Sequence, residues 1–218
     1  MEDIQYNKKK VCIVGAGGLG RELASWLLLD EQFVNEFELI GFLDDNLKAL
    51  DGFQTKLAII DRITVDTLNS SKNVILAVAD IAYKKKIIEE IITKSNVELL
   101  SYKFHNVLVG LSTNIGKGVV LSPSVLISCN VVIGNGVFVN SGSQIGHDVQ
   151  IGNYTSIMSN VDIGGGAIIE DEVFIGSAAV ILPGVTICKG ARIGAGSVVL
   201  KNIKKVGTYF GNPAKRIF

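Results

Sequence analysis

The second half of the chain repeats a hydrophobic position every six residues. From Val109 to Val199, every sixth residue is valine, isoleucine or leucine, sixteen times in succession and without an insertion. The residue directly after each of these large positions is often glycine. The fourth residue after each large position is small or β-branched from Val119 to Ser197. Such a unit places one large and one small side chain inward and forms a turn with glycine or asparagine.

This period predicts a β-solenoid in which three short strands complete one triangular coil. Sixteen repeats correspond to about five coils, roughly 25 Å in height at the ~4.8 Å spacing between strands. Coils that pair along the axis leave unpaired edges only at the two ends. The alternative is a sandwich of alternating strands, which is typical of an irregular spacing of about 8–12 residues and fits this period poorly.

The first half of the chain has the pattern of an α/β domain. Its predicted elements are strands at 10–14, 39–43 and 73–79 and helices at 21–29 and 82–94. The order strand, glycine loop, helix, strand indicates a small parallel sheet. We therefore expect two domains, with the boundary near the point where the six-residue period begins.

Composition and charge narrow the class of protein. Lys+Arg and Asp+Glu both number 21, whereas nucleic-acid-binding domains usually carry a basic excess. Residues 118–146 contain no charged side chain, but their serines, asparagines and glycines argue against a membrane-spanning helix. The start of the chain has no signal-peptide pattern, and the three scattered cysteines fit a reducing compartment. We expect a cytoplasmic protein that binds neither nucleic acid nor membrane.

The glycine-rich stretch at 15–20 reads G-A-G-G-L-G and lies between a predicted strand and a predicted helix, which is the context of a phosphate-binding loop. Backbone N–H groups around Gly15 and Gly17 suit a phosphate or pyrophosphate. Asp44 and Asp45 end the following strand, where such domains bind a ribose hydroxyl. The sequence thus predicts a nucleotide site. The alternative is a tight turn that only lets helix and strand approach.

His147 is the candidate catalytic residue of the solenoid. It occupies a turn position, and Asp148 beside it could orient the ring and leave one nitrogen free as a base. Gly165 lies eighteen residues later, one coil along, and its bare N–H could bind a developing oxyanion. A base beside such an amide suits acyl transfer to an amine or hydroxyl; the alternative is a plain surface histidine.

Two further observations concern cofactors. The chain has two histidines, too few for the three-histidine zinc site of a solenoid metalloenzyme, so we expect no metal. Residues 201–218 carry five Lys or Arg and no acid, which suits a phosphorylated, extended cofactor such as coenzyme A. The same segment could also be a cap over the last coil, and the two roles are compatible.

Together these features resemble one family. The six-residue period, His147-Asp148, the closing G-N-P-A-K-R-I and the segments G-A-G-G-L-G-R-E and G-F-L-D-D-N are similar to the sugar O-/N-acyltransferases of the sialic acid O-acetyltransferase type. The resemblance spans essentially the entire chain. It implies a Rossmann-like nucleotide-sugar-binding domain at 1–104, a left-handed parallel β-helix at 105–204 and a cofactor-side tail at 205–218. It also implies a homotrimer with active sites between neighbouring prisms, and acetyl-CoA as cosubstrate.

The resemblance assigns roles to individual residues. His147 matches the catalytic base, Asp148 its acidic neighbour and Gly165 the amide that holds the acetyl carbonyl. The remaining matches are Ser177 and Ala195 along the pantetheine, Pro213 and Lys215 near the cofactor, and Gly15, Gly17, Arg21, Asp44 and Asp45 in the nucleotide-recognition segment.

Two positions depart from the family pattern. Leu19 and Ser156 stand where histidines are common, and both positions concern substrate specificity or acetyl placement rather than the base. We predict an acetyl-CoA-dependent N-acetyltransferase that acts on the amine of a nucleotide-linked amino-deoxy sugar, for bacterial surface glycan synthesis, by direct attack in a ternary complex. The alternatives are a sugar O-acetyltransferase of the sialic acid type and a non-catalytic, trimeric nucleotide-sugar-binding scaffold.

Overall fold

The computed structural model of the chain describes residues 8–71 and 73–218. The chain divides into two compact units. The first consists of the described part of Met1–Val78 together with Lys86–Leu100, and the second of Ala79–Lys85 with Ser101–Phe218. The predicted α/β first half and the predicted solenoid are both confirmed.

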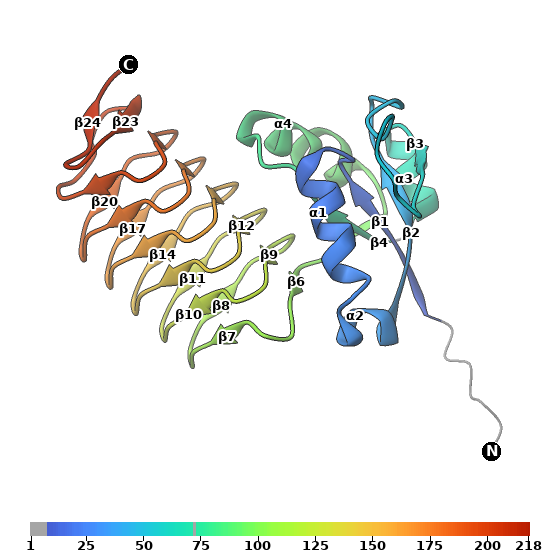
Figure 1. Cartoon of the computed structure of the whole chain (residues 1–218), viewed down its shortest axis with the longest axis horizontal. Helices are drawn as coiled ribbons and strands as arrows, with labels where there is room; N and C mark the ends of the chain where they lie inside the picture. Colours follow the sequence, from blue (N-terminus) through green and yellow to red (C-terminus); the bar gives the residue numbers. More distant parts are fainter. Residues whose placement is uncertain (1–7, 72) are drawn as a thin grey trace. The chain divides into compact units, whose positions relative to one another are not determined.

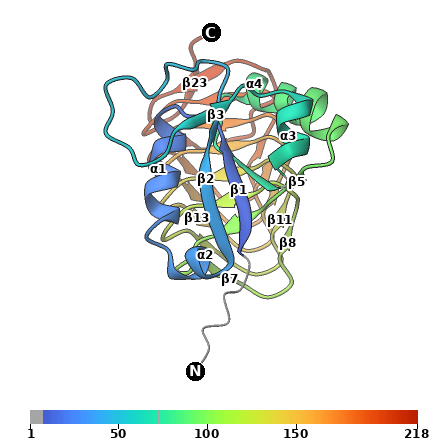
Figure 2. The same ribbon diagram turned by 90° about the vertical axis from the view of Figure 1, so that its right-hand side faces the viewer.

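The first unit is built on a five-stranded parallel sheet with the order β3-β2-β1-β4-β5. The strands are β1 (Lys9–Val14), β2 (Phe37–Leu43), β3 (Ile59–Asp61), β4 (Asn73–Leu76) and β5 (Glu98–Leu99). After β1 the chain adds β2 and β3 on one side of that strand, and it then returns to add β4 and β5 on the other side. Because parallel crossovers are right-handed, helices α1 (Gly18–Leu27) and α3 (Val65–Ser71) flank opposite sides of the sheet (Figure 2).

The remaining helices of this unit follow local signals. Helix α2 (Glu31–Glu36) begins where the Asp30 side chain accepts a hydrogen bond from the Gln32 N–H at 3.0 Å, as an N-cap does. The single helix predicted at 82–94 is instead three consecutive helical segments. They are α4 (Ile81–Lys86), the π-helical turn η1 (Ile87–Ile91) and the 3₁₀ turn η2 (Ile92–Lys94). The division between the two units falls just before the π turn, since residues 79–85 belong to the second unit and residues 86–100 to the first.

The second unit is a three-sided parallel β-helix, whose coils are stacked in Figure 1. One sheet contains β7 (Leu108–Val109), β10 (Leu126–Ile127), β13 (Gln144–Ile145), β16 (Asp162–Ile163), β19 (Val180–Ile181) and β22 (Val198–Val199). The next contains β8 (Asn114–Ile115), β11 (Val132–Ile133), β14 (Gln150–Ile151), β17 (Ile168–Ile169) and β20 (Thr186–Ile187). The third contains β6 (Tyr102–Lys103), β9 (Val120–Leu121), β12 (Phe138–Val139), β15 (Ser156–Ile157), β18 (Phe174–Ile175), β21 (Arg192–Ile193), β23 (Thr208–Phe210) and β24 (Lys215–Arg216).

Pairing between coils is in register throughout. From β7 to β22, each residue pairs with the one eighteen positions away, as Gln144 does with Asp162 and Ile145 with Ile163. The second residue of every strand is the large residue of the six-residue repeat, and all of these are buried from Leu121 to Val199. The small residues that follow four positions later are buried as well. Both predicted inward positions therefore form the core.

Two positions of each repeat shape the turns. A positive φ recurs at every sixth residue from Ser112 to Gly196, and eight of these fifteen positions are not glycine. The glycine that follows a large residue serves a different purpose, because its backbone lies against the next coil. A Cβ on Gly146 would lie 2.6 Å from the Gly165 nitrogen. Close approach, not an unusual backbone angle, explains glycine at this position.

The tail extends one sheet of the β-helix. Strand β23 pairs in parallel with β21, and β24 pairs with β23 in the antiparallel direction. The tail therefore covers the last coil, as a cap does. No helix in the described ranges has the length and apolar character needed to cross a membrane.

Lys84 fastens residues 79–85 to the β-helix. Its side chain is buried, and Nζ donates to the Thr155 carbonyl at 3.2 Å and to Ser156 Oγ at 2.8 Å. Ser156 Oγ in turn donates to the Ala79 carbonyl at 2.9 Å. Burial lowers the pKa of Lys84 to about 7, and the charge of Asp80 offsets part of that effect. The buried amine of Lys84 is therefore removed from water and bonded to Thr155 and Ser156 instead.

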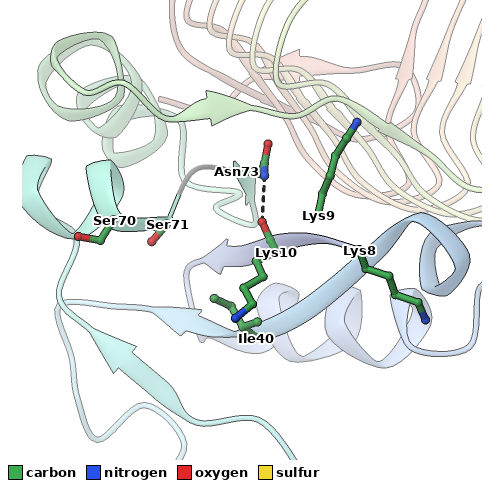
Figure 3. A pocket seen from close by; sticks show the side chains of 7 residues that line it. All are labelled: Lys8, Lys9, Lys10, Ile40, Ser70, Ser71 and Asn73. Atoms are coloured by element: carbon green, nitrogen blue, oxygen red, sulfur yellow. Dashed lines mark hydrogen bonds between the residues drawn. The ribbon is translucent and has the colours of Figure 1, made fainter. Parts of the chain in front are cut away.

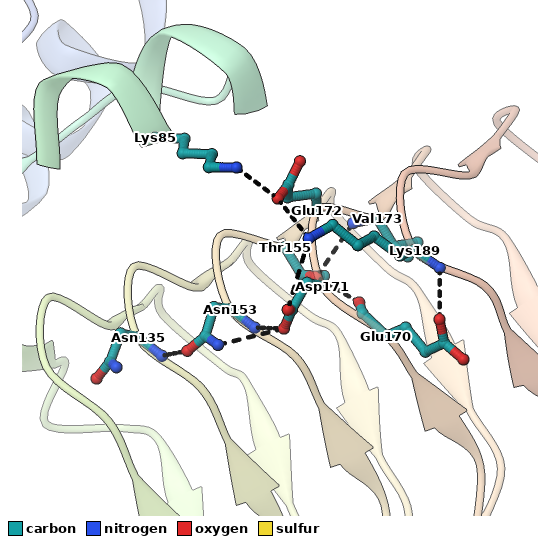
Figure 4. Close-up of polar contacts among 9 residues, drawn as sticks. All are labelled: Lys85, Asn135, Asn153, Thr155, Glu170, Asp171, Glu172, Val173 and Lys189. Carbon is teal, nitrogen blue, oxygen red and sulfur yellow. Dashed lines mark hydrogen bonds and ion pairs between the residues drawn. The ribbon is translucent and has the colours of Figure 1, made fainter. Parts of the chain in front are cut away.

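Lys85, the next residue, forms an ion pair with Glu172, 2.9 Å from Nζ to Oε1 (Figure 4). Lys189 lies on the other side of that carboxylate at 3.1 Å. Both lysines lower the pKa of Glu172, chiefly through the hydrogen bond from Lys85. A ladder of side chains from Asn135 through Asn153 to Asp171 leads along the same corner to this cluster.

The buried amine of Lys84 predicts a pH dependence of stability. The folded pKa of about 7 lies below the ordinary value of 10.5, so the unfolded chain binds more protons between these pH values. The free energy of unfolding then rises with pH across this window. Lys84→Met buries no charge. We therefore expect its free energy of unfolding, relative to that of the native chain, to be highest near pH 6 and to fall as the pH rises toward 9. Denaturant titrations at several pH values measure it; Lys86→Met, at an exposed position, is the control. Parallel curves for Lys84→Met and the native chain contradict the prediction.

Candidate functional site

His147 projects from a corner of the β-helix between strands β13 and β14. Its side chain is 65% exposed, and Nδ1 lies 2.7 Å from Oδ2 of Asp148. Asp148 occupies the positive-φ position of the turn, with φ +61°. The sharp turn brings the two neighbouring side chains together, so the pair that the sequence predicts has direct hydrogen-bonding geometry.

Asp148 has a second partner in the preceding coil. Asn130 Nδ2 donates to its Oδ1 at 3.1 Å. The hydrogen bond with His147 and, next, that with Asn130 lower the pKa of Asp148. The carboxylate therefore stays ionised and accepts a proton-bearing Nδ1, which leaves Nε2 as the free nitrogen of the neutral ring. Sequence reasoning missed Asn130, although its place eighteen residues before Asp148 was a usable signal.

Gly165 lies directly beside the His147 ring, one coil along. A Cβ at position 165 would be 2.6 Å from Nε2, so only glycine leaves the ring in place. Within the described parts of the chain, no acceptor is bound to the Gly165 N–H, whereas the Gly166 N–H donates to the His147 carbonyl at 2.8 Å. One corner thus combines a nitrogen that can accept a proton with a bare backbone donor, a combination suited to acyl transfer.

The glycine loop of the first unit lies at the carboxyl end of β1, where the strand order reverses. Gly15 adopts φ +102° and donates to the Leu43 carbonyl at 2.8 Å. Gly17 precedes helix α1, and a Cβ there would meet no atom within 4 Å. The first-turn N–H groups of α1 have no partner within the helix. This is the usual ligand position of such sheets and suits an anionic group. Leu19 is half-buried in the same turn.

Asp44 and Asp45 bind backbone groups in the structure. Asp44 accepts from the Ala16 N–H at 2.7 Å with one oxygen and from the Asn46 N–H at 2.8 Å with the other. Asp45 Oδ1 accepts from the Ile63 N–H at 3.1 Å. Each acid therefore fixes the loops at the carboxyl edge of the sheet, a role that the sequence reasoning did not assign. Ribose recognition by either residue stays a prediction.

Arg21 is likewise engaged within the chain. Its Nη1 donates to the Ala16 carbonyl at 3.2 Å, and its guanidinium lies 3.6 Å from the centre of the Phe53 ring. Such a cation–π contact orients the guanidinium beside the glycine loop. Phe53 is 53% exposed and belongs to this edge, although no sequence motif pointed to it.

The predicted cofactor residues lie elsewhere on the β-helix. Ser177 and Ala195 follow β18 and β21, so they occupy a different corner from His147, and both are exposed. Pro213 and Lys215 lie in the tail, where Lys215 pairs with Phe210. Ser156 is buried by its contacts with Lys84 and Ala79. A single chain does not bring the base and these residues to one corner.

Two cavities of the first unit are lined by residues outside the glycine loop. One of about 510 Å³ is lined by residues at the amino ends of β1 and β4, with Asn73 Nδ2 donating to the Lys10 carbonyl at 3.0 Å (Figure 3). The other, of about 370 Å³, shares Ile40, Ser70 and Ser71 with it. Neither contains a predicted site residue. In the part of the chain that the structure describes, no three His, Cys, Asp or Glu side chains gather as metal ligands.

Two family models match the chain, and together they cover more than half of it. The PglD N-terminal domain matches residues 10–91. The bacterial transferase hexapeptide model, with six repeats, matches residues 166–201. No curated protein sequence matches.

Several solved structures share the fold over almost the whole chain. The acetyltransferase domain of PglB from Neisseria gonorrhoeae is 24% identical, with a TM-score of 0.78, over 96% of this chain and 100% of that one. A histidine-to-alanine mutant of GDP-perosamine N-acetyl transferase from Caulobacter crescentus, in complex with CoA and GDP-perosamine, is 21% identical, with a TM-score of 0.83, over 95% and 96%. WeeI from Acinetobacter baumannii is 24% identical, with a TM-score of 0.62, over 95% and 99%.

The contact between Gly165 and the His147 ring is testable by adding one methyl group. We expect Gly165→Ala to displace the ring by about 1 Å, because carbon atoms prefer separations of about 3.5–4.0 Å. Since the ring is the free end of an exposed side chain, the free energy of unfolding should change by no more than ~1 kcal/mol. A crystal structure and a denaturant titration measure the two effects. Gly18→Ala, whose Cβ would meet nothing within 4 Å, is the control; an unmoved ring in Gly165→Ala contradicts the assignment.

Proposed function

The chain belongs to the PglD-type hexapeptide acyltransferase family, and we propose that it is an acetyl-CoA-dependent N-acetyltransferase acting on a nucleotide-linked amino-deoxy sugar. The observation that carries this proposal is the corner at which the ring of His147, held by Asp148, lies beside the backbone of Gly165, whose N–H has no partner among the described residues. The similarity to a transferase solved in complex with CoA and GDP-perosamine supports the substrate class.

The reaction is a direct transfer within a ternary complex. The sugar amine attacks the thioester carbonyl, a carbon–nitrogen bond forms, and the carbon–sulfur bond breaks to release the thiol of coenzyme A. His147 Nε2 accepts the proton that the amine loses, the ionised Asp148 stabilises the resulting imidazolium, and the imidazolium then gives this proton to the departing thiolate, which restores the neutral ring. The Gly165 N–H would donate to the carbonyl oxygen as it gains negative charge. Each step requires only groups that the corner provides.

Acetyl-CoA and the nucleotide-sugar would bind different parts of the chain. Ser177 and Ala195 have short side chains on successive coils and leave room for an extended pantetheine, and Lys215 is a cation suited to its phosphates. The first turn of α1 after Gly17 would hold the diphosphate of the sugar nucleotide. Asp44 supports this site by fixing the Ala16 N–H.

The same placement supports a homotrimer. The base lies on one corner of the β-helix and the proposed pantetheine-lining residues on another. A pantetheine that touched both sets at once would therefore draw them from neighbouring copies, with a base from one chain and the cofactor surface from the next. A parallel arrangement of three such prisms provides three equivalent sites.

A coupled thiol-release assay tests the activity and its rivals. Acetyl-CoA is supplied with UDP-, GDP- and dTDP-linked 3-amino and 4-amino sugars, and with sialic acid as a hydroxyl acceptor. Mass spectrometry of the product distinguishes an amide from an ester. Release with an amino sugar alone supports the proposal, and release with sialic acid alone supports O-acetylation. Nucleotide-sugar binding with neither thiol release nor thermal stabilisation by acetyl-CoA supports the scaffold.

His147→Ala should lower kcat by about 10²–10⁴, the usual contribution of a positioned general base. Binding of CoA, measured by calorimetry, should change little because the ring contributes to proton transfer. His105→Gln, which replaces the chain's other histidine, is the matched control and should retain activity. Full turnover by His147→Ala would exclude this residue as the base.

Asp44→Ala should raise the KM for the nucleotide-sugar about tenfold, since it frees two backbone N–H groups that the carboxylate binds, at about 1–3 kcal/mol for a charged acceptor. The kcat at saturation should stay close to the native value, because the reacting groups lie on the β-helix. Initial-rate kinetics measure both quantities. Asp51→Ala, at an exposed position of the same loop, is the control. An unchanged KM in Asp44→Ala would remove the support for nucleotide binding at this edge.

A further inference from the structure

Asn130 completes a three-residue chain of hydrogen bonds across two coils. Its Nδ2 donates to Asp148 Oδ1 at 3.1 Å, and Asp148 Oδ2 lies 2.7 Å from His147 Nδ1. The carboxylate is thus held from both sides, by an amide in the coil before it and by the ring beside it. Among the described residues, Asn130 is linked to the ring by hydrogen bonds only through Asp148.

The turn does not require asparagine at position 130. Asn130 has φ +59°, but the equivalent positions of the β-helix also accept Ser112, Ala178 and even Tyr154 at nearly the same angle. An alanine in this conformation is therefore compatible with the fold. What distinguishes Asn130 from those residues is its donor, eighteen residues before Asp148 and directed at that carboxylate.

Exposure alone would make the hydrogen bond weak, because the Asp148 side chain is 55% exposed. The backbone compensates. The Asn130 N–H donates to the Leu111 carbonyl at 3.0 Å and the Asp148 N–H to the Cys129 carbonyl at 3.1 Å. Because these bonds already fix the backbone of both turns, forming the side-chain hydrogen bond costs only the rotamer freedom of the two side chains.

We propose that Asn130 is a positioning residue, which holds Asp148 in the orientation that keeps the proton of His147 on Nδ1 and directs the free Nε2 at the Gly165 corner. A free carboxylate could rotate about χ1 and χ2 and leave the ring to adopt either tautomer. Asn130 restricts that rotation. This role rests on the proposed function, since it matters for turnover only if Nε2 is the base.

Histidine tautomers provide a test that needs no substrate. Long-range ¹H–¹⁵N spectra of the full-length, ¹⁵N-labelled protein distinguish Nδ1–H from Nε2–H in a neutral ring. The chain has two histidines, so His105→Gln assigns the signals. We expect the native His147 to be mainly Nδ1–H. Asn130→Asp has nearly the same shape and tolerates a positive φ, but it offers an acceptor in place of the donor. It should shift the population toward Nε2–H, and Asn130→Ala should do the same.

Kinetics provide the second readout. Loss of an orienting partner should lower kcat about tenfold in Asn130→Asp, with the KM for acetyl-CoA unchanged within about twofold. Asn160→Ala is the matched control for stability and for the tautomer, because Asn160 has φ +57° on a different corner. Its His147 spectrum should equal the native one.

The outcomes separate the two proposals. A native tautomer and a native kcat in Asn130→Asp overturn the positioning role, even in an active enzyme. A loss of the Nδ1–H tautomer in a protein whose native form transfers no acetyl group supports the positioning role and contradicts the proposed function alone. If all Asn130 variants unfold while Asn160→Ala is stable, Asn130 is structural and the proposal fails.

Discussion

The corner of the second unit that contains His147 depends on strand pairing at an interval of eighteen residues. Parallel pairing of this kind superimposes equivalent positions of successive coils, so residues far apart in sequence meet at one corner. The Gly165 backbone lies beside the His147 ring for this reason, and Asn130 reaches Asp148 for the same reason. A single inserted residue would move all later side chains out of these columns. The chemistry therefore depends on a constant repeat length as well as on the residues at this corner.

The register of the coils also explains how a backbone N–H at the corner with His147 is free to act as a donor. At a corner of the β-helix, a polar side chain of the next coil can accept a hydrogen bond from a backbone N–H. On the corner with Asn135, side-chain oxygens of successive residues occupy these N–H groups, from Asn135 N–H to Asn153 and from Asn153 N–H to Asp171. In the part of the chain that the structure describes, no side-chain oxygen binds the N–H of Gly165. The Gly165 N–H remains available to bind a ligand because no described side chain accepts a hydrogen bond from it, in contrast to the N–H groups at the corner with Asn135.

Sequence alone predicted the β-helix well because its core follows one simple rule, with a large inward residue every six positions and a small one between. It also placed His147, Asp148 and Gly165 together, since an eighteen-residue period determines their spacing. It did not anticipate the contacts of Lys84 or Phe53, which depend on where irregular segments fold back. The roles predicted for Asp44 and Asp45 were incomplete for a similar reason: a carboxylate at a strand end suits a ribose or a backbone N–H equally, and only the structure reveals the backbone contacts.

A short segment from the first half of the sequence belongs to the second unit, and this limits where the chain can be divided into separate domains. Residues 79–85 lie in the sequence of the first half but pack with the β-helix, and the chain then returns to the first unit at residue 86. A chimera joined at residue 100 would give the β-helix a foreign copy of this segment and leave Ser156 without its native lysine. Recombination between relatives would preserve that contact only if residues 79–85 travelled with the repeats. The segments that must be inherited together, residues 79–85 and the β-helix, are thus separated in sequence, although each unit has its own fold.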